Sequence, residues 1–324
     1  MGEMQSIATW WMWLGFGLFV LAMLAIDMFL LGRHGAQKVG AREALSWSLV
    51  WFFLAILFGG ALWGWLDHTA GRAIADTKAM EYFTGYLLEK TLAIDNIFVF
   101  VMLFSYFAVP IEYQKRVLVY GVLGAIVLRA LMILLGAWLI AEFHWVLYVF
   151  GAFLLITGIK MFVFADHEPD LTQNPLLRWL RAHVRITETY HGDKFWIVKN
   201  GVRWFTPMFL VLVLVEFSDV IFAMDSIPAI FAITSDPFIV FTSNIFAILG
   251  LRALYFLLAD MADRFHLLKY GLAVVLMFVG TKMLIVEWFK IPVAVSLGVV
   301  ISILGISILL SLKASRKKAT LGGS

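Results

Sequence analysis

Two apolar stretches of the sequence carry the same arrangement of acidic side chains. EKTLAIDNI at 89–97 and DVIFAMDSI at 219–227 each have an acid at the first position, Asp at the seventh and an amide or hydroxyl at the eighth. An ionisable side chain at the centre of a membrane span costs at least about 2.5–3.5 kcal/mol, so such residues indicate function. Carboxylate, amide and hydroxyl oxygens favour hard divalent cations such as Mn²⁺, Mg²⁺ or Ca²⁺. The predicted metal ligands are Asp95, Asn96, Asp225, Ser226, Asp219, Glu89 and Glu216.

Three basic residues also lie inside the predicted spans of this chain. They are Arg129, Arg252 and Lys90, which we predict to be supporting counter-charges. One interpretation is that the arginines pair with carboxylates and hold the helices together. The other is that they exchange partners with a bound cation.

Helical geometry decides which of these side chains share a face. Residues seven apart lie on one face of a regular helix, so Glu89 aligns with Asn96 and Asp219 with Ser226. Asp225 lies about 120° round from Asp219. Pro228 cannot donate to the carbonyl of residue 224, so we expect a helix break there that lets carboxylates and carbonyl converge. Met224 could add a thioether ligand that favours Mn²⁺.

The composition places these helices in a membrane. Of the 324 residues, 62% are hydrophobic and 15% charged, and the mean hydropathy is +0.92. A soluble enzyme of this length needs more polar residues to cover its surface. The sequence has no cysteine, which excludes disulfides, thiolate metal sites and thiol redox chemistry. The fold class is therefore predicted to be an all-α polytopic membrane protein, with no cofactor and no enzymatic activity.

Apolar runs long enough to cross a bilayer, about 20 residues as helix, occur nine times. The predicted transmembrane helices cover 9–31, 44–66, 82–106, 117–140, 145–164, 205–233, 237–259, 270–287 and 291–312. The first has no basic residue before it and is too long for a cleaved signal peptide, so we expect it to stay as an anchor.

The loops between these spans differ strongly in basic residues. Alternate loops carry 17 Lys and Arg on one side of the membrane and 3 on the other. Because cytoplasmic loops carry the excess of positive charge, the N-terminus is predicted to be outside and the C-terminus, with its basic residues at 313–318, inside. The net charge of +3 thus reflects topology and does not indicate a nucleic-acid partner.

The longest loop, 165–204, lies on the cytoplasmic side by this count. Residues 176–186 place leucines on one helical face and arginines on the other, as in an amphipathic basic helix. Asn200 and Gly201 separate two short runs of strand-forming residues, which indicates a β-hairpin. A cap lying on the membrane surface and a regulatory or partner-binding role both remain open.

The spans contain an internal repeat. The motif at 89–97 recurs at 219–227, LRAL at 128–131 recurs at 251–254, and GIKM at 158–161 recurs as GTKM at 280–283. Each copy has three spans, so the second copy must be inverted in the membrane. We therefore predict one transmembrane domain over 1–324, with three-helix repeats at 82–164 and 205–287 and a site between them near the midplane.

The motifs EKTLAIDNIFVF and VEFSDVIFAMDSIPAIFAIT resemble those of the TerC family of integral membrane proteins, and the similarity covers nearly the whole chain. The resemblance implies a manganese exporter. Members of the family are associated with resistance to tellurium compounds and with alkaline conditions, and some of them are described as membrane-bound redox modulators. The resemblance also implies functional roles for a set of acidic and amide residues, all of which are present in this chain. They are Glu89, Asp95, Asn96, Glu216, Asp219 and Asp225.

The function expected from residues and resemblance together is a secondary transporter that exports Mn²⁺ across the bacterial inner membrane. Proton antiport is the natural coupling, because protons and metal compete for carboxylates. Ca²⁺ or another divalent cation is the alternative cargo. A membrane scaffold and a membrane redox modulator are the alternative functions. The expected partners are the cation and the lipid bilayer, and the sequence identifies no protein partner.

Overall fold

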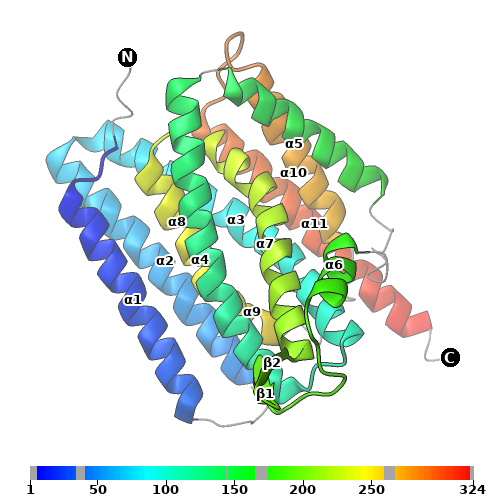
Figure 1. Ribbon diagram of the computed structural model, residues 1–324. Helices are drawn as coiled ribbons and strands as arrows, with labels where there is room; N and C mark the ends of the chain where they lie inside the picture. Colours follow the sequence, from blue (N-terminus) through cyan, green and yellow to red (C-terminus); the bar gives the residue numbers. More distant parts are fainter. Residues whose placement is uncertain (1–5, 34–40, 144, 165–173, 259–266, 322–324) are drawn as a thin grey trace.

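The computed structural model describes residues 6–33, 41–143, 145–164, 174–258 and 267–321. It is a bundle of helices with one short hairpin, which confirms the all-α prediction (Figure 1). The helices α1, α2 and α8 lie on one side of the bundle, and α5, α10 and α11 lie on the other (Figure 1). The hairpin and the short helix α6 lie together near one end.

Eight of the nine predicted spans each coincide with one helix of the structure, and the span predicted over 237–259 is divided between two helices, α8 and α9. The helices are α1 Trp10–Arg33, α2 Ala41–Thr69, α3 Arg72–Tyr106, α4 Ile111–Glu142, α5 Val146–Val163, α6 Pro175–His183, α7 Pro207–Phe231, α8 Pro237–Leu249, α9 Leu251–Leu258, α10 Leu268–Leu284 and α11 Val293–Leu321. Within the described residues, five helices are long and apolar enough to cross a membrane alone, and six if α8 and α9 form one span. The count of nine spans stays a prediction.

The longest helix, α3, is the centre of the bundle. It packs against α2, α7, α8, α9, α10 and α11. This explains its composition, because polar residues such as Glu89 and Asn96 can lie inside a bundle but not against lipid.

The predicted helix break at Pro228 is wrong. Helix α7 runs without interruption from Pro207 to Phe231, with Pro228 inside its last turn. Pro228 cannot donate to the carbonyl of Met224, but only three residues of α7 follow it, so one lost hydrogen bond does not interrupt the helix. The bend lies instead at Gly250, where α8 and α9 meet at 41°.

The structure has a helix and a hairpin where the loop predictions expected them, but the helix ends at His183, three residues before the predicted end at 186, because Val184 is already extended. Helix α6 begins after Asn174, whose side chain accepts hydrogen bonds from the amides of Leu176 and Leu177, and it buries Leu177 and Leu180. Strands β1 (Trp196–Lys199) and β2 (Val202–Phe205) pair antiparallel. Asn200 and Gly201 join them with φ of 53° and 74°, a backbone conformation that Asn and Gly adopt most readily.

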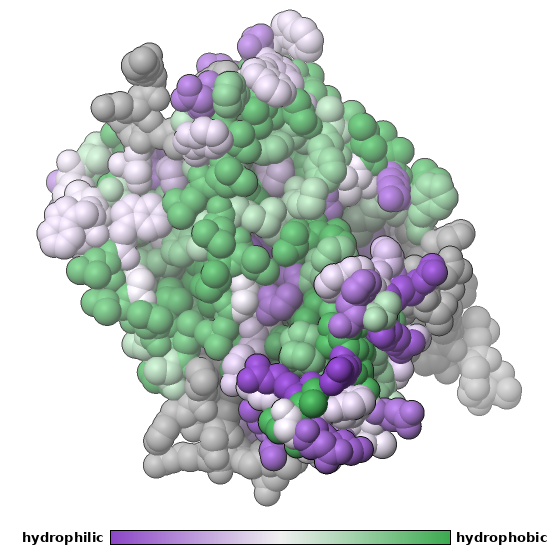
Figure 2. All heavy atoms as spheres, in the orientation of Figure 1, coloured by the Kyte–Doolittle hydropathy of each residue, from purple (hydrophilic) through white to green (hydrophobic). Residues whose placement is uncertain are grey.

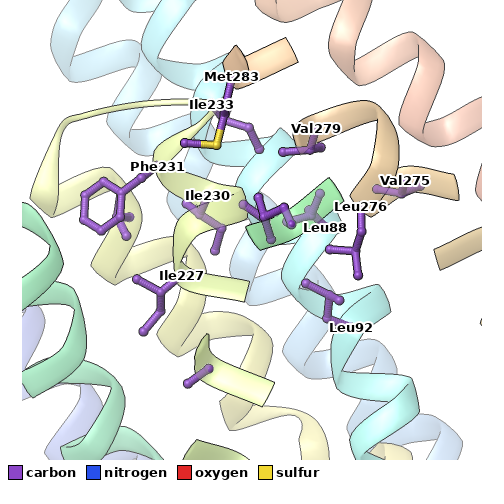
Figure 3. Close-up of a cluster of buried hydrophobic side chains, with 14 of the residues drawn as sticks. Leu88, Leu92, Ile227, Ile230, Phe231, Ile233, Val275, Leu276, Val279 and Met283 are labelled. Carbon is purple, nitrogen blue, oxygen red and sulfur yellow. The ribbon is translucent and has the colours of Figure 1, made fainter. Parts of the chain in front are cut away.

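Side chains of α3, α7 and α10 form the largest part of one apolar core (Figure 3). Leu88 and Leu92 of α3, Ile227 and Ile230 of α7 and Leu276 of α10 all belong to this core. Because lipid is as apolar as these side chains, close packing stabilises this core more than removal from water does.

Helices α5 and α10 make the closest helix contact. A Cβ at Gly158 would lie 2.8 Å from the carbonyl oxygen of Ala273, and one at Gly280 would lie 2.7 Å from that of Gly151. The offset of 122 that relates Gly158 to Gly280 also relates Gly151 to Ala273. The two contacts are therefore reciprocal, as a two-fold relation between α5 and α10 requires. The inverted repeat itself stays a prediction.

The outer surface is apolar over most of the visible helices (Figure 2). Polar residues gather at one end, over the hairpin and α6 (Figure 2). This distribution is typical of a protein whose helices face lipid and whose loops face water.

Candidate metal site

A buried polar network lies in the middle of the bundle around Arg129 of α4. The Arg129 side chain is 1% exposed and donates to Glu89, to Asp219 at 3.2 Å, to Asn244 at 2.8 Å and to Ser226 at 3.3 Å. Asn96 donates to Asp219 at 3.4 Å. We call these six residues the Arg129 network; they come from α3, α4, α7 and α8.

Helical spacing positions four members of this network as expected. Glu89 and Asn96 both turn toward it from α3, and Asp219 and Ser226 both turn toward it from α7. The continuous helix α7 keeps Asp219 and Ser226 on one face because seven residues complete nearly two turns. The two apolar runs thereby bring one carboxylate each to a single guanidinium.

The network leaves several polar atoms without a partner. One carboxylate oxygen of Glu89, the side-chain oxygen of Asn96 and the side-chain nitrogen of Asn244 are buried and make no hydrogen bond. A buried oxygen without a donor loses about 1–3 kcal/mol relative to water, and native proteins contain few of them. The two oxygens are free acceptors of the type that a hard cation takes.

Asp225 lies outside the Arg129 network. Its carboxylate lies beside Thr157 of α5, and one of its oxygens is buried without a hydrogen-bond partner. Because α7 is continuous, Asp219 and Asp225 point to different faces of the helix. Asp95 belongs to α3, and its side chain is outside the described part of the structure.

Glu216 lies one turn before Asp219 on α7. Its carboxylate packs against Gly124 of α4, where a Cβ would overlap it, and one of its oxygens is buried without a partner. Met224 is 48% exposed, whereas the members of the Arg129 network are buried, and its role as a ligand stays a prediction.

The two other counter-charges lie elsewhere. The Lys90 ammonium donates to the carbonyl of Ala247 at 3.2 Å, in the last turn of α8, where helix carbonyls have no amide partner. It lies against Gly250, the residue at the α8–α9 bend. Arg252 lines a small cavity with Leu24, Trp51, Val119, Val122, Leu123 and Leu249.

Asn244 was not predicted from the sequence. It is fully buried beside Thr242 and Ser243 in α8. Three consecutive polar residues in an otherwise apolar span were the signal available, since such residues inside membranes line functional sites. Among the residues that the structure describes, no three His, Cys, Asp or Glu side chains converge as around a bound metal ion. The network instead joins two carboxylates to one guanidinium.

Comparisons with known proteins show strong similarity along the whole chain. It is 59% identical over 301 residues to the "Putative membrane-bound redox modulator Alx" of Escherichia coli strain K12, covering 93% of this chain and 94% of the relative. It is 51% identical to the protein of that name from Photorhabdus laumondii, covering 98% and 99%. It is 47% identical to "Uncharacterized membrane protein STKORF319" of Myxococcus xanthus, covering 99% and 98%.

No solved structure matches the chain. Residues 74–319 match the family described as "Integral membrane protein TerC family", and this range includes every member of the Arg129 network. The chain therefore belongs to the TerC family of integral membrane proteins.

Proposed function

We propose that the protein is a secondary transporter that exports Mn²⁺, with the Arg129 network at the centre of its translocation site. The observation that supports this most is the convergence of Glu89 and Asp219, from two sequence-related helices, in the buried middle of the bundle. A carboxylate at that depth raises the free energy of the folded protein, so its presence indicates a function such as binding a charged cargo. Oxygen ligands favour Mn²⁺, Mg²⁺ or Ca²⁺ over softer metals.

The orientation and coupling follow from charge. The excess of basic residues in alternate loops supports a cytoplasmic C-terminus in a bacterial inner membrane. A site built on carboxylates releases protons when it takes up metal, so an inward proton gradient is able to drive metal outward. The protein thus acts without a resident cofactor and without a chemical reaction.

Uptake of Mn²⁺ into inverted membrane vesicles tests this function, with Mg²⁺, Ca²⁺ and Zn²⁺ as competitors and with or without a pH gradient. Wild-type vesicles are expected to take up Mn²⁺, and Asp219→Asn vesicles to remain at the level of empty-vector vesicles. Equal uptake by wild type and Asp219→Asn, at equal protein levels, contradicts a transport role for this site.

The name of the Alx relatives points to the second candidate function, redox modulation. A flavin or haem absorbance spectrum of the purified protein would support it. Against it stands the sequence, which has no cysteine for thiol chemistry. A scaffold role, the third candidate, predicts an unchanged cell phenotype when Glu89, Asp95, Asp219 and Asp225 are all replaced by alanine.

A further inference from the structure

The guanidinium of Arg129 occupies the point where the ligand oxygens meet. Its donors engage Glu89, both oxygens of Asp219, Ser226 and Asn244. These carboxylate, hydroxyl and amide oxygens are the ligand types that Mn²⁺ prefers. The same oxygens cannot surround two cations at once, because like charges a few ångströms apart repel strongly in a low-dielectric interior.

We propose that Arg129 is a tethered counter-cation that holds the cargo position in the empty site and leaves it when the metal ion binds. This inference rests on the proposed transport function. Arginine suits the role because it stays charged at any physiological pH, so the two carboxylates never lack a positive partner. Removing that partner costs several kcal/mol at a buried ion pair.

Glu216 provides the alternative partner for the displaced arginine. Side chains on a helix point toward its N-terminus, so Arg129 extends along α4 in the direction of Gly124. The Glu216 carboxylate lies against Gly124, and one of its oxygens is buried without a hydrogen bond. Since Glu216 precedes Asp219 by one helical turn, the guanidinium needs to move by about 5 Å along α7.

The unpartnered oxygens of the network provide the first contacts for the incoming ion. Glu89 keeps one carboxylate oxygen and Asn96 its side-chain oxygen without any donor, and both atoms are buried. An ion that binds these two oxygens then competes with Arg129 for Asp219. Exchange in this order avoids a state in which Glu89 and Asp219 face each other without a cation.

Direct binding of Mn²⁺ to the purified full-length protein in lipid nanodiscs tests the proposal, measured by electron paramagnetic resonance of free Mn²⁺. Arg129→Gln removes the competitor, so its Mn²⁺ affinity is expected to rise by about tenfold, which is about 1.4 kcal/mol. Arg129→Lys is expected to stay within about threefold of wild type because it keeps the charge. Glu216→Gln is expected to lower the Mn²⁺ affinity, since the displaced arginine then lacks a partner.

A second readout separates this role from a structural one. Arg129→Gln is expected to unfold at a lower temperature than wild type without metal and to gain more from added Mn²⁺. Arg116→Gln on the same helix is the matched control, because Arg116 pairs with Asp193 outside the network; its Mn²⁺ affinity is expected to be unchanged.

Unchanged or weaker Mn²⁺ affinity in folded Arg129→Gln overturns the proposal, because the arginine then only holds the ligands in place. If that variant does not fold, an unchanged affinity in Glu216→Gln overturns it instead. Absence of saturable Mn²⁺ binding in wild type and every variant defeats the proposed transport function as well.

Discussion

Two buried polar clusters lie along the bundle, and they differ in how completely their atoms are paired. The Arg129 network leaves atoms of Glu89, Asn96 and Asn244 without partners. The second cluster lies where α7 ends and α8 begins; we call it the Asp236 cluster, and its members are Ser6, Ile7, Lys78, Glu81, Thr234 and Asp236.

Every carboxylate of the Asp236 cluster has its own donors. Glu81 accepts from Lys78 at 2.8 Å and from Thr234 at 2.6 Å. The Asp236 side chain caps α8 by accepting from the amide of Phe238 at 3.0 Å. It also accepts from the Ser6 hydroxyl at 3.2 Å and from the Ile7 amide at 3.0 Å. In the described part of the chain, neither Glu81 nor Asp236 has a buried oxygen without a partner.

Under the proposed function, the difference distinguishes a structural cluster from a site that binds a ligand. A fully paired cluster rigidifies its surroundings, whereas unpaired buried oxygens are costly unless a ligand uses them. The Asp236 cluster joins the start of α3, the α7–α8 turn and the residues before α1. The Arg129 network retains acceptors for a cation, so substitutions in the two clusters should act on different properties.

The largest expected effect is that of Glu89→Gln on transport. The change removes one of the two carboxylates that meet at Arg129, so Mn²⁺ uptake into inverted vesicles should fall to the level of empty-vector vesicles. Glu81→Gln is the matched control on the same helix and should keep at least about half of the wild-type uptake. Similar losses in both variants would remove the distinction between the clusters.

Asp236→Ala should act on stability instead. Loss of a helix N-cap costs about 0.5–2 kcal/mol, and here the contacts with Ser6 and Ile7 are lost as well. We expect a lower unfolding temperature in detergent, measured by intrinsic tryptophan fluorescence, with Mn²⁺ uptake per folded molecule retained. Asp236→Asn, which can still cap the helix, should lose less stability than Asp236→Ala.

Thr234→Val should have a smaller effect of the same kind. It removes one neutral donor to Glu81 and one acceptor for the Asp236 amide, which together cost about 1–3 kcal/mol. Lys78 still pairs with Glu81, so the cluster should persist. Thr234→Ser keeps the hydroxyl and should unfold close to wild type; an equal loss in both would indicate packing rather than hydrogen bonding.

The smallest effect is expected for Met224→Leu. The side chain is 48% exposed, and Leu has a similar volume. Mn²⁺ uptake and its selectivity over Mg²⁺ should stay within about twofold of wild type. A selective loss of Mn²⁺ transport would indicate that the Met224 thioether binds the ion.

Much of the architecture could be predicted from local patterns. Hydrophobic runs marked where the helices lie, the Leu and Arg spacing marked α6, and Asn200-Gly201 marked the hairpin turn. These features depend on a few neighbouring residues, whose side-chain period and backbone preferences act independently of the rest of the chain. The shared faces of Glu89 with Asn96 and of Asp219 with Ser226 followed from the helical period in the same way.

Long-range features could not be predicted from these patterns. Pro228 signals a break, but α7 stays continuous, and the bend lies at Gly250, where Lys90 fills the space beside the missing side chain. A backbone responds to the helices packed against it, and the sequence does not show which helices those are. The same reason explains why Asn244 was missed.

The sequence by itself determined which residues could bind a cation and on which helix faces they lie. Only the tertiary structure decided that Arg129, and not its repeat counterpart Arg252, joins the two carboxylates, and that Asp225 turns toward α5. The physical reason is that the period of a helix fixes directions around its own axis. The partner that a buried charge meets depends on how separate helices pack, through contacts between residues far apart in the chain.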